Sequence, residues 1–150
     1  MAIGEYCNRE VVVAHPEVSA KEAARLMRKY HVGSLVLVNR TDHGLVPIGV
    51  VTDRDLVVEL MALDIDNPPS ISAGELSCRE LVTVNESDDV MAVIETMQRH
   101  GVRRLPVVNR QGYLIGIITA DDILDVLADA LDSVARLGTD QGKLEQRLRA

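Results

Sequence analysis

The chain has 150 residues, of which 47% are hydrophobic, and a formal net charge of −7 from 16 basic and 23 acidic side chains. This length and balance are typical of a globular chain with one ordinary domain or two small ones, and they exclude a disordered chain. The acidic charge argues against nucleic acid and anionic membrane surfaces as partners, because both attract basic proteins.

Aromatic, cysteine and histidine residues are few and scattered. Three tyrosines are the only aromatic residues, so the core must be aliphatic. Cys7 and Cys78 lie far apart and the four histidines form no closely spaced pair, whereas a zinc site needs about four ligands at short spacings. We therefore expect free thiols and no metal site. The first ten residues lack the features of a signal peptide, and no apolar run approaches the ~20 residues that span a bilayer, so we expect a cytoplasmic protein.

Taken in chain order, the first 62 residues predict a β-α-β-β-α unit. Residues 9–14 form a short β-rich segment, and residues 19–30 form an amphipathic helix whose first turn, Ser19-x-x-Glu22, has the pattern of a capping box. Residues 35–38 are a continuous apolar run, typical of a strand buried on both faces. A polar turn at 39–44, a returning strand at 48–51 and a second helix complete the unit.

The same unit occurs again in the second half of the chain. The segment GEYCNREVV, which begins at Gly4, matches GELSCRELV, which begins at Gly74, and the offset falls from 70 to 67 within a polar loop. Two copies of one fold tolerate such an indel in a loop. Strands are predicted at 79–84, 105–108 and 114–118, with a helix from about Asp89 and a turn at 109–112. The predicted organisation is a first repeat at 1–62, a connector at 63–72, a second repeat at 73–137 and a polar tail at 138–150.

The last helix is predicted to be longer than its counterpart, from about residue 121 to residue 137. Gly138 is its predicted C-cap, and the polar tail beyond is expected to fray. Its apolar residues cover more than one face, which predicts contact with a second subunit as well as with its own core. These residues are Ile123, Leu124, Val126, Leu127, Ala130, Leu131, Val134 and Leu137. The alternative is a helix that wraps its own domain.

Two segments of one pattern, GVVTDRD at 49–55 and GIITADD at 116–122, occupy the same place in the two repeats. With these segments, VRRLPVV at 102–108 and the pair Pro16-Glu17, the sequence closely resembles the CBS-domain family, named for cystathionine beta-synthase, over residues 4–137. The resemblance implies an α/β fold of the α+β type. Two β-α-β-β-α repeats would pack as a pseudo-two-fold pair with two clefts.

Members of this family commonly bind adenosine compounds, namely AMP, ADP, ATP or S-adenosylmethionine, and regulate an attached enzyme or channel. For this chain the resemblance implies a stand-alone regulatory pair with a nucleotide ligand, no required cofactor and an unidentified regulated protein. The family's habit of pairing modules, like the long last helix, implies a disc-like homodimer with two-fold symmetry. The alternative is a dimeric interaction or scaffold protein with vestigial clefts. An enzyme is disfavoured, because no nucleophile is paired with a base and no P-loop is present.

The Thr-x-x-Asp of each motif falls where a strand ends and a helix begins. A carboxylate there can accept two hydrogen bonds from the vicinal hydroxyls of a ribose. The threonine hydroxyl and the free N–H groups of the helix start can meet a phosphate. The same pattern is also that of an ordinary capping box, so both interpretations stand at the level of the sequence.

By the family pattern, each cleft combines the Thr-x-x-Asp of one repeat with strand residues of the other. Cleft A then contains Thr52, Asp55, Leu81, Val82, Arg103 and Arg104, with Asp121 approaching it. Cleft B contains Thr119, Asp122, Val11, Val12, Gly33 and Ser34, with Arg54 approaching it. The two arginines predict a preference for phosphorylated ligands in cleft A, whereas cleft B would hold an uncharged nucleoside or nothing. The alternative for both arginines is a solvated surface pair.

Overall fold

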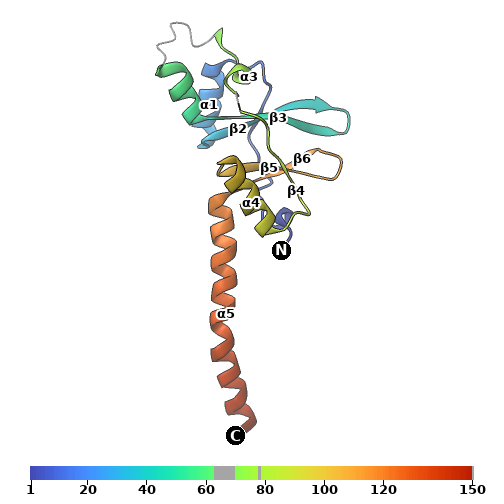
Figure 1. Cartoon of the computed structure of the whole chain (residues 1–150), viewed down its shortest axis with the longest axis vertical. Coiled ribbons are helices and arrows are strands. Elements are labelled where there is room, and N and C mark those ends of the chain that lie inside the picture. The colour runs from blue at the N-terminus through green and yellow to red at the C-terminus, as the bar shows by residue number, and fades with distance from the viewer. Residues whose placement is uncertain (63–69, 78, 150) are drawn as a thin grey trace.

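Two three-stranded sheets with their helices form the body of the protein, and one long helix projects from it (Figure 1). The computed structural model describes residues 1–62, 70–77 and 79–149. Most of the predicted connector lies outside these residues, as does Cys78. The two equivalent sheets confirm the predicted α/β fold of paired repeats.

The elements follow the predicted order in both repeats. The first repeat contains η1 (Ile3–Glu5), β1 (Val13–Ala14), α1 (Ala20–Tyr30), β2 (Ser34–Thr41), β3 (Gly44–Thr52), α2 (Asp53–Leu56) and the π-helical turn η2 (Val57–Met61). The second contains α3 (Ala73–Leu76), β4 (Val84–Asn85), α4 (Val90–His100), β5 (Arg104–Val108), β6 (Leu114–Thr119) and α5 (Ala120–Arg149).

The two sheets have the same topology and register. Each short first strand pairs in parallel with the central strand, and the third strand pairs with the central strand in antiparallel orientation. Leu37 pairs with Gly49 in the first sheet and Val107 with Gly116 in the second, and a bulge follows in both at the next residue of the central strand. This correspondence gives the two repeats their pseudo-symmetry.

The core of each repeat is completed by the first segment of the other repeat. Ile3 of η1 is fully buried in the core of the second repeat, and its N–H donates to the carbonyl of Asp88 at 2.8 Å. In the opposite direction, Ala73 and Leu76 of α3 are buried in the core of the first repeat. The N–H of Ala20 donates to the Ile71 carbonyl at 2.7 Å. The two cores therefore do not coincide with the two sequence repeats.

Gly49 in β3 and Gly116 in β6 allow the segment from the other repeat to pass close to each strand. A Cβ at Gly49 would lie 2.6 Å from Oγ of Ser77, and a Cβ at Gly116 would lie 2.6 Å from Sγ of Cys7. The Ser77 hydroxyl donates to the Val50 carbonyl at 3.0 Å. Cys7 is a free thiol, and its partial burial beside Gly116 raises its pKa. The motif glycines thus have a packing role that periodicity did not reveal.

Several local predictions are wrong in extent. The β segments predicted at 9–14 and 79–84 form strands only at Val13–Ala14 and Val84–Asn85. Residues 39–41 continue β2 instead of belonging to the turn, because their backbone groups pair with β3 as far as Thr41 opposite Gly44. The Ser19 capping box forms only in part: its hydroxyl accepts from the N–H of Glu22 at 3.1 Å, while the carboxylate of Glu22 pairs with Arg25 at 3.6 Å.

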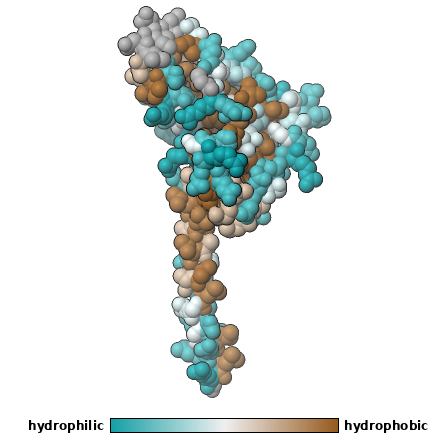
Figure 2. Space-filling model, viewed as in Figure 1, coloured by the Kyte–Doolittle hydropathy of each residue, from teal (hydrophilic) through white to brown (hydrophobic). Residues whose placement is uncertain are grey.

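The predicted end of the last helix is also wrong. α5 continues through Gly138 and ends at Arg149, so the segment predicted as a frayed tail is helical. Gly138 is not a C-cap, because a glycine C-cap has a positive φ and Gly138 does not. Residues 131–149 are exposed along the projecting part of α5 (Figures 1 and 2).

The ends of α1 and α4 provide a matched test of backbone strain. Both helices end with a left-handed residue, His31 at φ 53° and Gly101 at φ 61°. A non-glycine residue in this left-handed region costs about 1–2 kcal/mol of stability. Glycine avoids this cost, but it loses more chain entropy on folding, which cancels part of the gain. His31→Gly should therefore raise the free energy of unfolding by about 0.5–1 kcal/mol. Gly101→Ala should lower it by about 1 kcal/mol through the backbone alone, because no atom lies within 4 Å of its Cβ position. Urea titration measures both effects, and a destabilised His31→Gly variant would contradict the assignment.

Candidate functional site

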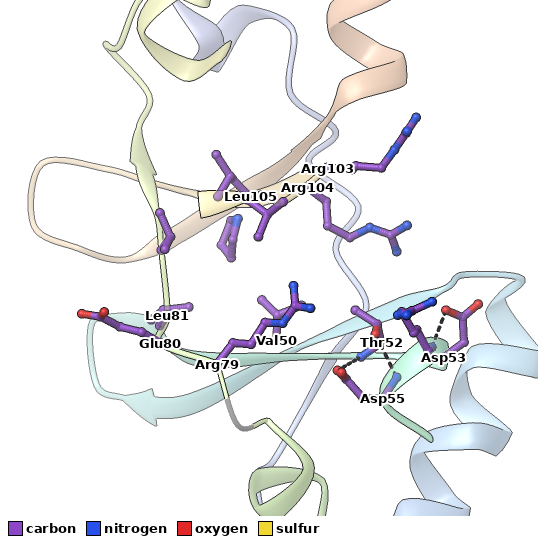
Figure 3. Close-up of a pocket in the computed structure, with 15 residues that line it drawn as sticks. Val50, Thr52, Asp53, Asp55, Arg79, Glu80, Leu81, Arg103, Arg104 and Leu105 are labelled. Atoms are coloured by element: carbon purple, nitrogen blue, oxygen red, sulfur yellow. Dashed lines mark hydrogen bonds between the residues drawn. The ribbon is translucent and has the colours of Figure 1, made fainter. Parts of the chain in front are cut away.

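A pocket of about 260 Å³ opens between the two repeats, where β3 ends and α2 begins (Figure 3). Its walls come from β3 and α2 of the first repeat, and from the residues before β4 and around the start of β5 in the second. They comprise Val50, Thr52, Asp53, Arg54, Asp55, Arg79, Glu80, Leu81, Val82, Gly101, Val102, Arg103, Arg104, Leu105 and Pro106. All six residues predicted for cleft A line this pocket, and their part in ligand binding stays a prediction.

Thr52 and Asp55 form a reciprocal capping box at the start of α2. The N–H of Asp55 donates to Oγ1 of Thr52 at 3.2 Å, and the N–H of Thr52 donates to Oδ2 of Asp55 at 2.8 Å. Thr119 and Asp122 make the same two bonds at the start of α5, at 3.2 Å and 3.0 Å. The cap and a ligand-binding role are compatible, because the cap uses one carboxylate oxygen. Among the described residues, Oδ1 of Asp55 accepts no hydrogen bond.

Four guanidinium groups line the pocket, two more than the cleft A set contains. Arg54, which the sequence placed near cleft B, lines this pocket instead, and Arg79 had been assigned only to a β segment. Within the described ranges, Arg54, Arg79 and Arg104 form no ion pair at 4.0 Å or less. Arg54 adjoins Asp55 in the sequence, and Arg79, which was not predicted as a site residue, lies two positions before Leu81; this proximity is the signal that could have placed both here.

Basic and acidic side chains are nearly balanced around the pocket. The lining has four arginines and three carboxylates, Asp53, Asp55 and Glu80, and Asp121 lies 3.9 Å from Arg103. Within the described ranges, the other three arginines form no ion pair, so their guanidinium groups are available for charge-assisted contacts with an anion. The pocket therefore has donors suited to an anionic group of a ligand.

Gly33 makes room for one of these arginines. A Cβ at Gly33 would lie 3.3 Å from Nη1 of Arg104 and 3.2 Å from Oδ2 of Asp53. Its carbonyl also accepts a hydrogen bond from the N–H of Asp53 at 3.0 Å. Gly33, predicted for cleft B, thus adjoins two residues of the cleft A pocket.

Arg103 and Asp121 are two highly exposed charges at the edge of this site. Their side chains are 79% and 85% exposed and approach to 3.9 Å, Nη2 to Oδ1. Asp121 accordingly lies beside cleft A, in the place that the sequence suggested. An exposed pair at this distance contributes little stability, so Arg103 is free to turn toward a ligand.

The remaining cleft B residues have local structural contacts. Thr119 and Asp122 cap α5, and Ser34 pairs with Thr52 across β2 and β3. The carbonyl of Val12 accepts from the N–H of Val36 at 3.1 Å, which ties Val11 and Val12 to the edge of the first sheet. A second ligand site at these residues stays a prediction.

The described residues contain neither a metal-binding cluster nor a helix that could span a membrane. In the ranges 1–62, 70–77 and 79–149, no group of three or more His, Cys, Asp or Glu side chains is arranged to hold a metal ion. No helix in the described part of the chain has both the length and the apolar character needed to cross a bilayer.

Comparison with known proteins identifies the family. The profile of the CBS domain matches residues 3–62 and 73–129, which together make up most of the chain. The chain therefore belongs to the CBS-domain family and contains a tandem pair of these domains. CBS-domain pairs are a class of ligand-binding regulatory modules.

Several similar proteins match over most of this chain. An uncharacterized protein of Methanopyrus kandleri, MK0525, is 38% identical over 84% of this chain, and the match spans 62% of that relative's length. Hypoxic response protein 1 of Mycobacterium tuberculosis is 34% identical over 67% of each chain. Its crystal structure, which has two coordinated zinc ions, superposes with a TM-score of 0.71 over 83% of this chain and 98% of its own.

A third neighbour has bound ligands. The CBS domain pair of protein MJ0100, solved in complex with 5′-methylthioadenosine and S-adenosyl-L-methionine, has a TM-score of 0.72 and 24% identity. The match covers 87% of this chain and 98% of that one. At this level of identity the likeness establishes the shared fold.

Proposed function

We propose that this protein is a regulatory module that senses an adenosine nucleotide in the pocket between its repeats and has no catalytic activity of its own. The observation that carries this proposal is the lining of the pocket. One wall holds the capped Asp55 with a free carboxylate oxygen, and the opposite wall holds Arg103 and Arg104. A ribose on the carboxylate and a phosphate on the arginines would use both walls at once.

The arginines of the pocket favour AMP, ADP or ATP over S-adenosylmethionine. Four guanidinium groups repel the sulfonium of S-adenosylmethionine and attract phosphate, with which arginine makes charge-assisted, bidentate contacts. The base would lie against aliphatic side chains such as Val50, Leu81 and Val82, because none of the described residues that line the pocket is aromatic. The neighbour with bound S-adenosylmethionine supports an adenosine-type ligand, and the arginines here support a phosphorylated one.

The volume of the pocket limits the size of a ligand that it could enclose. Small-molecule sites usually measure roughly 300–1,000 Å³, and the pocket, at about 260 Å³, is slightly smaller than this range, so part of a nucleotide would extend outside it. The nucleoside part would fill the space between the repeats, and the phosphates would lie toward the exposed Arg103.

Thermal unfolding with added ligands tests this function. A ligand that binds only the folded state at a hundredfold excess over its Kd stabilises by about 2.7 kcal/mol, which raises the Tm by roughly 5–10 °C for a chain of this size. AMP, ADP or ATP should produce this shift at millimolar concentration, and S-adenosylmethionine a smaller one. The measurement is differential scanning calorimetry.

Adenosine and inorganic phosphate serve as the matched controls, since each carries half of the proposed contacts. Either alone should shift the Tm less than AMP does. If all four adenosine compounds leave the Tm unchanged, the interaction or scaffold function becomes the better interpretation.

A further inference from the structure

The projecting part of α5 is an apolar helix face that the body of the protein leaves uncovered. Leu131, Val134, Leu137, Leu144 and Leu148 have between 56% and 79% of their surface exposed. Figure 2 shows apolar residues along this part of the helix, which extends away from both sheets. A soluble chain rarely exposes so many large apolar side chains on one element without a partner.

The sequence of α5 also makes it a poor helix in isolation. Gly138 and Gly142 both lie inside it, and glycine weakens a helix interior relative to alanine. In proteins, most helical stability comes from packing of an apolar face and not from propensity. Residues 131–149 are exposed in the single chain, so this packing must come from another molecule.

The apolar positions follow a heptad repeat that one polar residue, Gln141, interrupts. Positions a are Leu127, Val134, Gln141 and Leu148, and positions d are Ile123, Ala130, Leu137 and Leu144. Ile123 and Leu127 pack against the core of the second repeat, so the seam that is open to a partner begins at Ala130. A spacing of 3 and 4 residues kept from Ala130 to Leu148 is the pattern of a coiled coil.

We propose that α5 forms a parallel two-stranded coiled coil with α5 of a second copy of this chain. Each a and d residue then packs against its own counterpart, and Gln141 meets the partner's Gln141 within the seam. A polar residue at one a position fixes register and number of strands at a cost in stability. This inference goes beyond ligand sensing and is independent of the pocket.

The flanking positions favour the parallel orientation. The apolar residues next to the seam, Leu124, Val126 and Leu131, all lie near the body, whereas the corresponding positions near the tip are charged. In a parallel pair Val126 meets the partner's Leu131, because position g of one helix faces position e of the other. An antiparallel pair would place these apolar residues against charged ones. One like-charge contact, Asp140 with the partner's Glu145, opposes the parallel pair at its exposed end.

Light scattering at micromolar concentration tests the pairing. The wild-type protein should have twice the mass of one chain, and the double variant Leu137→Glu/Leu144→Glu should have the mass of one, with a dissociation constant raised at least 100-fold. The matched control, Ala135→Glu/Thr139→Glu, adds the same charge at outward positions b and f and should remain a dimer. A monomeric wild type overturns the proposal, as does a double variant that stays dimeric.

Single cysteines test the orientation without disturbing the seam. Under mild oxidation Gln141→Cys should give a disulfide-linked dimer, because only a parallel pair brings position 141 to its own counterpart. Thr139→Cys, on the outer face, should not crosslink. Failure of Gln141→Cys to crosslink in a protein that is dimeric through Leu137 and Leu144 overturns the parallel arrangement.

Discussion

Asp55→Asn should weaken the binding of AMP and of adenosine alike, by about 10- to 100-fold, while leaving the start of α2 intact. Asparagine keeps an oxygen that can accept from the N–H of Thr52, now bonded at 2.8 Å, and it replaces the second carboxylate oxygen with an amide that cannot accept from a ribose hydroxyl. Hydrogen bonds to charged groups contribute ~1.5–3 kcal/mol, and each tenfold change in Kd corresponds to about 1.4 kcal/mol. Titration calorimetry measures both ligands.

Arg104→Gln should affect the binding of AMP but not that of adenosine. The substitution removes a charge that would contact phosphate, so the affinity for AMP should fall by a similar factor while the affinity for adenosine stays nearly unchanged. Asp122→Asn is the matched control, since it edits the same kind of cap at the start of α5, outside this pocket. If Asp122→Asn abolished AMP binding and Asp55→Asn did not, the ligand would occupy the other cleft.

Ile3→Ala should cost about 2–5 kcal/mol of unfolding free energy, although Ile3 lies ten residues before β1 of the first repeat. Removing a fully buried isoleucine side chain loses its transfer free energy and leaves a cavity. Whole domains are stable by only about 5–15 kcal/mol, so this is a large fraction of the total. Urea titration measures the loss.

The position of the damage distinguishes this prediction from a general loss of stability. Hydrogen exchange should increase first in β4, β5 and β6, because Ile3 belongs to the core of the second repeat. Ile48→Ala is the control, since Ile48 is 39% exposed in β3 and should change the stability by about 1 kcal/mol or less. A loss below 1 kcal/mol in Ile3→Ala would show that the first segment is not part of that core.

Local patterns were sufficient to predict the repeated architecture. The continuous apolar runs at 35–38 and 105–108 became the buried central strands, and the Thr-x-x-Asp motifs became helix starts at Thr52 and Thr119. Such patterns depend on periodicity and capping, which act over a few residues. Equivalent registers in the two sheets agree with the repeated hairpin pattern, whose offset is 70 before the loop and 67 after it.

The packing of the two repeats against each other and the end of the last helix were not predictable from the same patterns. The segments that begin at Gly4 and Gly74 are nearly equivalent in sequence, so nothing local indicates that each completes the other repeat's core. Arg79 was missed, and Arg54 was expected near cleft B, because the place of both side chains depends on how the two repeats pack. The end of α5 was missed because a glycine at position 138 suggested a C-cap, while the apolar spacing that continues to Leu148 favoured a helix.

The base of α5 adjoins the pocket, and this position makes the helix a mechanical lever. The N–H of Ala120 donates to the carbonyl of Arg103 at 2.8 Å, and Arg103 lines the pocket. A helix of 30 residues is about 45 Å long, so a rotation of about 5° at its base moves its tip by about 4 Å. If α5 tilts as a rigid body at this base, its far end therefore moves much farther than Arg103 does.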